Sequence, residues 1–91
     1  MTDKQKQEQR EAISDILKNT CKDPKQWLKD YLDIEEEGDI LRVYVTLGGP
    51  TVWFAFNRAK HNGRLYYHTQ SGQTFKPFGK ATYDKLIQYV Y

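Results

Sequence analysis

The chain has 91 residues and a formal net charge of +2, and 38% of its residues are hydrophobic, 14% aromatic and 29% charged. A chain of this length holds one small core, so we expect residues 1–91 to form a single domain. One cysteine excludes an internal disulfide and a thiolate metal cluster. No apolar run approaches the ~18 residues of a membrane helix, and the polar start lacks the apolar region of a secretory signal, so we expect a cytoplasmic protein without a membrane partner.

The charges are divided unevenly along the chain. Residues 1–41 hold 7 Lys and Arg against 11 Asp and Glu, a balance of −4, whereas residues 42–91 hold 7 against 1, a balance of +6. Either the two halves attract each other within the fold, or the basic half contacts nucleic acid or an acidic partner. The sequence leaves both interpretations open.

The first part of the chain is predicted to be helical after a polar start. Residues 1–9 are almost all polar, and we expect them to fray. From Ala12 to Cys21 the apolar residues are spaced by three and four positions, which predicts a helix over about residues 5–20.

A second helix is predicted to begin at Asp23–Gln26, which reads DPKQ. Aspartate is a favoured cap, proline suits the first helical position, and Gln26 lies where a capping box has Glu or Gln. We expect this helix to reach about Asp33 and to bury four large side chains: Trp27, Leu28, Tyr31 and Leu32. The acidic run Glu35–Asp39 is expected to form a solvated turn.

The spacing of apolar residues then changes from helical to alternating, which predicts two strands at Ile40–Leu47 and Thr51–Asn57. Gly48 and Gly49 between them are predicted to form a tight hairpin turn in which both residues have positive φ. One face of this hairpin should pack against the helices, and its side chains are Leu41, Val43, Val45, Leu47, Val52, Phe54 and Phe56.

Two further turn signals divide the next part of the chain. Asn62-Gly63 is typical of a turn, and Arg64–Thr69 is predicted to form the third strand. Ser71-Gly72 predicts another turn, after which Gln73–Lys76 would add a short fourth strand.

The last segment, at about Ala81–Val90, is an amphipathic helix by its spacing. Its apolar residues at i, i+3, i+4 and i+7 are Tyr83, Leu86, Ile87 and Val90. The predicted fold class is therefore α+β, with two N-terminal helices, an antiparallel meander of three to four strands and one C-terminal helix.

The second face of the predicted sheet holds the candidate binding residues. Alternation places six aromatic and basic side chains on it: Arg42, Tyr44, Trp53, Arg64, Tyr66 and His68. If a helix covers this face, Trp53 belongs to the core, which the scarcity of aliphatic residues favours. If the face is open, it is typical of a stacking platform with basic edges for single-stranded nucleic acid.

Catalytic chemistry has little support in the sequence. The only acidic residue after Asp39 is Asp84, so paired carboxylates are lacking in the sheet half of the chain. Cys21, His61 and His68 show neither the spacing of a nucleophile with its base nor that of a zinc site. We therefore expect a protein that is not an enzyme and has no metal or cofactor.

Two predicted strands are joined through Leu47-Gly48-Gly49-Pro50-Thr51-Val52, and a third strand and a C-terminal amphipathic helix follow. This pattern, over Asp39–Tyr91, resembles small uncharacterised phage and mobile-element proteins. The resemblance implies a non-enzymatic accessory protein that occupies the surface of a host protein or nucleoprotein complex, such as a nuclease, a polymerase or a defence complex. The alternative hypothesis is a nucleic-acid-binding module that uses the basic, aromatic face of the sheet.

Overall fold

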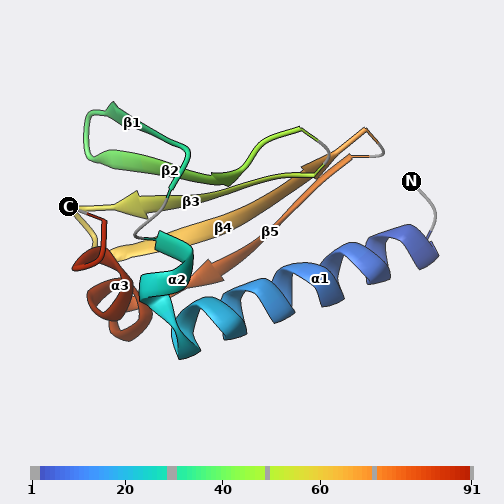
Figure 1. Cartoon of the computed structure of the whole chain (residues 1–91), viewed down its shortest axis with the longest axis horizontal. Helices are drawn as coiled ribbons and strands as arrows, with labels where there is room; N and C mark the ends of the chain where they lie inside the picture. The colour runs from blue at the N-terminus through green and yellow to red at the C-terminus, as the bar shows by residue number, and fades with distance from the viewer. Residues whose placement is uncertain (1–2, 29–30, 49, 71, 91) are drawn as a thin grey trace.

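The computed structural model describes residues 3–28, 31–48, 50–70 and 72–90, and in these residues three helices lie against one face of a five-stranded antiparallel sheet (Figure 1). The fold is α+β, as predicted, with five strands in place of three to four. The elements are α1 (Asp3–Lys22), α2 (Pro24–Leu28), β1 (Asp33–Glu37), β2 (Ile40–Thr46), β3 (Thr51–Asn57), β4 (Asn62–Thr69), β5 (Gly72–Phe78) and α3 (Lys80–Ile87).

The five strands form a meander, in which each strand pairs with the next along the chain. Val43 lies opposite Phe54, and Phe54 lies opposite Leu65, so the predicted apolar face runs unbroken across β2, β3 and β4. The core between this face and the helices consists of Ile13, Leu28, Leu41, Val43, Val52, Phe54, Phe56, Leu65, Phe78, Tyr83, Leu86 and Val90. Tyr83, Leu86, Ile87 and Val90 all contribute to this core or pack against it, as predicted, but α3 ends at Ile87, so Val90 lies in the turn that follows the helix.

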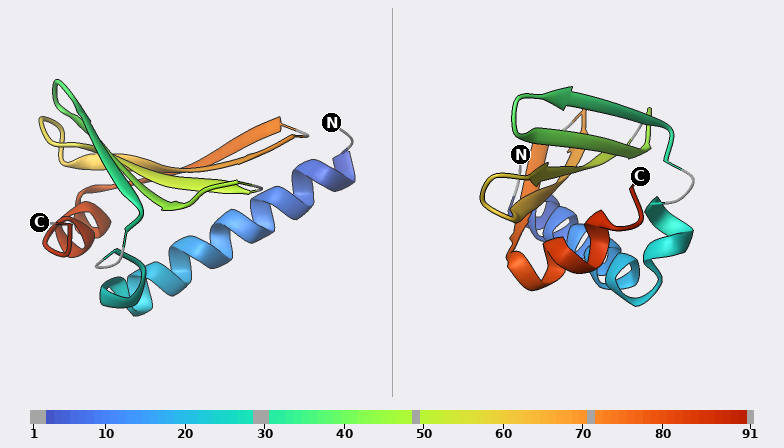
Figure 2. Two further views of the ribbon diagram at one scale, coloured as in Figure 1. Left: turned by 45° about the horizontal axis from the view of Figure 1, so that its top comes forward. Right: turned by 90° about the vertical axis from the view of Figure 1, so that its left-hand side faces the viewer.

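All the helix–sheet contacts lie on this one face, and Figure 2 shows the helices together beneath the sheet. Helix α1 runs along β5 and β4, α3 lies against β4, and the short α2 lies against β2. None of the helices in the described residues is long and apolar enough to span a membrane.

Helix α1 begins earlier than expected, because residues 3–9 are helical where we predicted fraying. Gln9 is only 7% exposed, and its side-chain amide donates a hydrogen bond to the hydroxyl of Thr69 at 2.9 Å. This contact joins the first turns of α1 to the end of β4, which the sequence pattern did not reveal.

Helix α2 is shorter than predicted and ends at Leu28. Its start is as expected, since the Asp23 carboxylate accepts a hydrogen bond from the backbone N–H of Gln26 at 3.3 Å. The expected burial of Leu32 is wrong, because its side chain is 59% exposed. By this point the chain has joined the sheet, and the Leu32 N–H donates to the Tyr44 carbonyl at 2.8 Å.

The acidic segment that we predicted as a turn is mostly an edge strand. Asp33–Glu37 forms β1 and pairs with β2, and the turn is confined to the next two residues, where Gly38 has a φ of 59°. Two arginines stabilise these carboxylates. The Arg42 guanidinium lies 2.9 Å from a carboxylate oxygen of Glu37, and the Arg58 guanidinium lies 3.8 Å from one of Glu36.

The turn between β3 and β4 also lies elsewhere than predicted. The chain turns at residues 58–61, where His61 has a φ of 54°, and Asn62-Gly63 already belongs to β4. Gly63 is needed for packing, since a Cβ there would meet the backbone carbonyl of Ala55 and come within 2.6 Å of the Phe78 ring.

The β2–β3 hairpin follows the prediction only in part. Gly48 has a φ of 102°, as expected for the turn, whereas Gly49 lies outside the described residues. Leu47 was expected in the core, but it is 58% exposed. A bulge between Tyr44 and Thr46 is the reason, because it breaks the alternation before Leu47 is reached.

The last strand is longer than expected, since β5 continues to Phe78 in place of ending at Lys76. Proline is compatible with an edge strand, so Pro77 does not interrupt it. Of the predicted Ser71-Gly72 turn, Ser71 lies outside the described residues and Gly72 has a φ of 142°.

Substitution of Gly63 by alanine should lower the free energy of unfolding by about 1–3 kcal/mol, because the new methyl group overpacks the space beside Phe78. Urea unfolding measures this loss. The control is Gly79→Ala, where the new methyl group would meet no atom within 4 Å beyond its chain neighbours and φ is −93°. Equal stability of the two variants would contradict the packing role of Gly63.

Candidate functional site

The side of the sheet that faces away from the helices is the candidate site, and we call it the open face. The strand register places all six predicted residues there: Arg42, Tyr44, Trp53, Arg64, Tyr66 and His68. The same register adds six residues from the two edge strands, which the sequence pattern missed: Asp33, Glu35, Glu37, Gln73, Phe75 and Pro77. The sequence pattern does not show these residues, because the acidic segment predicts a turn and the alternation does not define the register of β5.

Four aromatic side chains cross the open face in one row, which we call the aromatic row. Tyr44, Trp53, Tyr66 and Phe75 come from β2, β3, β4 and β5, and each lies directly opposite the next. Successive ring centroids are 5.7, 5.1 and 5.6 Å apart. Cross-strand aromatic pairs of this kind stabilise the sheet that carries them.

The expectation that Trp53 is a core residue is wrong. Its side chain is half-buried and lies on the open face, while its neighbours Val52 and Phe54 are at most 1% exposed and lie among the core residues. The partial burial of Trp53 comes from the two tyrosines beside it, Tyr44 and Tyr66, and not from a helix.

The rings of the aromatic row are packed against one another. Trp53 and Tyr66 are stacked with an angle of 8° between their planes, and the Arg64 guanidinium lies 4.7 Å from the centre of the Phe75 ring. At the other end of the row, the Tyr44 hydroxyl donates to a carboxylate oxygen of Glu35 at 3.4 Å. The ring faces of Trp53 and Tyr66 on which a nucleic-acid base would stack are therefore engaged with neighbouring rings, whereas Phe75 at the end of the row stays 48% exposed.

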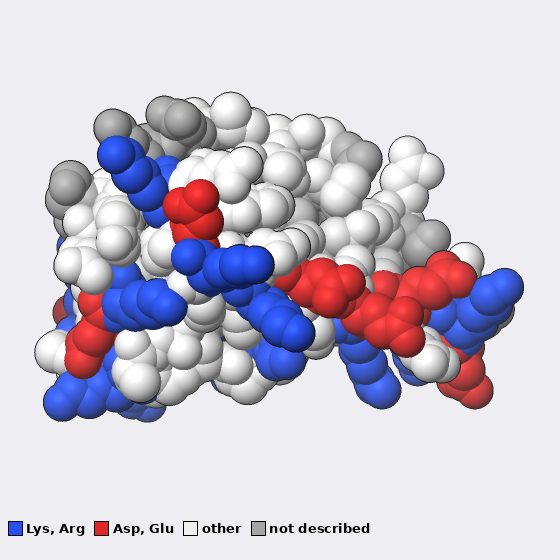
Figure 3. Space-filling view, turned by 60° about the horizontal axis from the view of Figure 1, so that its bottom comes forward, with Lys and Arg blue, Asp and Glu red and all other residues white. Residues whose placement is uncertain are grey.

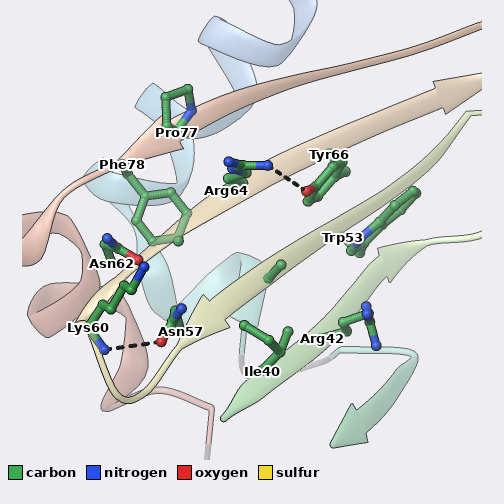
Figure 4. Close-up of a pocket in the computed structure, with 12 residues that line it drawn as sticks. Ile40, Arg42, Trp53, Asn57, Lys60, Asn62, Arg64, Tyr66, Pro77 and Phe78 are labelled. Atoms are coloured by element: carbon green, nitrogen blue, oxygen red, sulfur yellow. Dashed lines mark hydrogen bonds between the residues drawn. The ribbon is translucent and has the colours of Figure 1, made fainter. Parts of the chain in front are cut away.

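Beside the aromatic row the open face is hollowed, and the hollow has a volume of about 550 Å³ (Figure 4). Trp53 and Tyr66 form one side of the hollow. Ala55 lies next to these rings and fills little of the space, because its side chain is only a methyl group. Arg42, Lys60 and Arg64 also line it, and no acidic residue of the described chain does. The structure thus brings four of the six predicted residues together around one cationic hollow.

The remaining two predicted residues lie outside the hollow. Tyr44 belongs to the aromatic row but does not line the hollow. His68 lies on the far side of the aromatic row from Arg64, opposite Thr51, and its side chain is exposed.

The open face carries both signs of charge. Asp33, Glu35 and Glu37 of β1 share this face, where Glu35 lies opposite Arg42 and the Arg42 guanidinium donates to Glu37 at 2.9 Å. This hydrogen bond raises the pKa of Arg42 above its usual value. The pKa of Tyr44 is also raised, because partial burial and then the nearby Glu35 carboxylate both disfavour the phenolate.

Residues considered for metal or nucleophilic chemistry lie apart from this face. Cys21 is half-buried and unbridged near the end of α1. His61 stacks on Tyr83 and lies 3.9 Å from the Asp84 carboxylate. In the described part of the chain, no three His, Cys, Asp or Glu side chains are grouped so that they could hold a metal ion.

No protein-family model, no curated protein and no solved structure matches this chain. Functional interpretation therefore depends on the geometry of the open face.

Trp53→Ala should lower the free energy of unfolding by less than Phe54→Ala does. For Phe54→Ala we expect a loss of about 3–5 kcal/mol, because the Phe54 ring is fully buried. We expect about 1–3 kcal/mol for Trp53→Ala, because half-burial and two ring contacts are lost. Urea unfolding of the two variants, which differ at adjacent positions on opposite faces, measures the difference. Equal losses would show that the open face is covered in solution.

Stability should fall at alkaline pH partly through Tyr44. Because the pKa of Tyr44 is raised in the folded state, the unfolded chain releases this proton first, and stability falls as the pH rises past about 10. Urea unfolding at about pH 8 and about pH 11 should show a larger loss for the wild type than for Tyr44→Phe, which has no phenol to titrate. Equal losses would contradict the raised pKa.

Proposed function

We propose that this protein is a non-enzymatic binding domain that docks its open face on the surface of another protein. The observation that carries the proposal is the aromatic row, which no helix in the described residues covers. On the resemblance to phage and mobile-element proteins, the partner is a host protein or nucleoprotein complex. By occupying that surface, the domain would act as an accessory factor or an inhibitor, for example of a host defence complex.

The composition of the open face supports a protein partner. Tyrosine, tryptophan and arginine are the residue types most enriched among those that dominate protein–protein binding energies. Here they lie side by side, since Arg64 is held between the Tyr66 hydroxyl at 3.5 Å and the Phe75 ring. Phe75 is 48% exposed at the edge of the sheet, which leaves apolar surface for a partner to bury.

A nucleic-acid partner is the alternative, and two observations weigh against it. The stacked rings of Trp53 and Tyr66 leave little free ring surface for bases, and the three carboxylates of β1 would repel a phosphate backbone laid across the open face. On the helix side of the molecule, the face seen in Figure 3 carries Asp and Glu side chains as well as Lys and Arg.

Affinity capture from host lysates with a matched set of variants tests the proposal. The open-face variants are Arg64→Glu and Phe75→Ala. The controls are Lys18→Glu, which makes the same charge change on the exposed side of α1, and Tyr89→Ala, which removes an aromatic ring that is 37% exposed. A protein retained by the wild type and by both controls should be recovered about tenfold less with each open-face variant.

Two outcomes would overturn the proposal. One is the recovery of no protein that distinguishes the open-face variants from their controls. The other is binding to single- or double-stranded oligonucleotides, seen by fluorescence anisotropy, that weakens steeply with salt and is lost in Arg64→Glu, because this is the behaviour of a nucleic-acid-binding module.

A further inference from the structure

We infer that the cationic hollow of the open face receives a carboxylate side chain, an Asp or Glu, from the partner protein. This inference rests on the proposed function and names the group that the hollow recognises. It follows from the placement, pairing and surroundings of the three cations.

The placement comes from the strand register. Arg42 and Arg64 lie directly opposite Ala55 on its two neighbouring strands. Since neighbouring strands are about 4.8 Å apart, the two arginine Cα atoms are about 10 Å apart across the methyl group of Ala55. Lys60, from the turn after β3, also lines the hollow. Three cations therefore line one hollow. The Arg42 guanidinium is turned toward Glu37 on β1, whereas the Arg64 guanidinium lies on the other side of Ala55, near Phe75 on β5.

The ion pairs around the hollow leave an excess of positive charge. Glu37 already accepts a hydrogen bond from Arg42, but in the described part of the chain neither Arg64 nor Lys60 pairs with an acidic residue. A guanidinium offers parallel N–H groups that match the two oxygens of a carboxylate. An incoming carboxylate would therefore complete the charge pairing of the hollow.

The surroundings strengthen this recognition. The Arg64 guanidinium lies 3.5 Å from the Tyr66 hydroxyl and 4.7 Å from the centre of the Phe75 ring, contacts that restrict its side chain before it binds. The aromatic side of the hollow, with Trp53, excludes part of the water that would screen the charges.

A single acidic side chain fits this face better than a chain of phosphates. The carboxylates of Asp33, Glu35 and Glu37 lie within the same face, and an extended polyanion that crossed it would approach them. A protein surface can instead present one acidic residue to the hollow and basic residues to β1. The charge pattern of the open face is complementary to such a mixed surface.

Titration of the isotope-labelled protein with two blocked tripeptides, Ac-Ala-Glu-Ala-NH2 and Ac-Ala-Gln-Ala-NH2, tests the inference by NMR. The Glu peptide should shift the indole N–H signal of Trp53 and the side-chain N–H signal of Arg64 in a saturable way. The Gln peptide should not, and Trp27, which lies in α2 below the sheet, should stay unshifted with both. Arg64→Gln should weaken binding of the Glu peptide about threefold or more, and the control Lys18→Gln should leave it unchanged.

Three outcomes would overturn the inference: equal shifts with both peptides, an Arg64→Gln variant that binds the Glu peptide as the wild type does, or inorganic phosphate that binds the hollow more tightly than the Glu peptide. These outcomes are distinguishable from failure of the proposed function. If the peptide does not bind but Phe75→Ala still loses the captured protein, the open face remains a docking surface and only the carboxylate assignment fails.

Discussion

The burial of only one face of the sheet is the constraint on which the rest of the structure depends. The three helices supply apolar side chains such as Ile13 and Leu86 for one layer of core, and they contact the face of the sheet that holds Phe54 and Phe56. The second face has to be stable in water. Tyr and Trp suit this position, because each has a large apolar ring and a polar atom at its edge. The aromatic row therefore stabilises the sheet and at the same time forms the candidate binding surface.

The distribution of charge follows from the same one-sided packing. An edge strand without a covering helix risks pairing with another chain, and charged side chains reduce that risk. In β1 the charged side chains include glutamates, of which Glu37 pairs with Arg42 and Glu36 pairs with Arg58. Both ion pairs join the acidic first half of the chain to the basic second half, so part of the charge asymmetry serves the fold. Among the described residues around the hollow, the positive charge without an acidic partner lies at Lys60 and Arg64.

The sequence predicted the elements in which one physical signal dominates and missed those in which packing overrides it. The strict alternation over β3 predicted that strand correctly, and the spacing of Tyr83, Leu86 and Ile87 predicted α3, although this helix ends at Ile87 and not at Val90. The glutamates of β1 have low strand propensity, and only pairing with β2 and its arginine makes them a strand. Gly63 was misread as a turn residue because its lack of a side chain serves the Phe78 ring, a contact between positions far apart in the sequence.

For the candidate site, alternation predicted which residues share the open face, but it could not predict how their rings lie. A row of rings lying flat on the sheet would offer their faces to bases, whereas rings stacked on one another offer edges and hydroxyl groups. The Trp53 and Tyr66 rings belong to the second class, because their planes differ by 8° and their centroids are 5.1 Å apart, too close for two rings lying side by side in one plane. Rings fixed in this way lose little freedom when they meet a partner, so more of the binding energy is retained. Under the proposed function, that energy would act against a surface of matching shape and mixed charge, such as a protein surface.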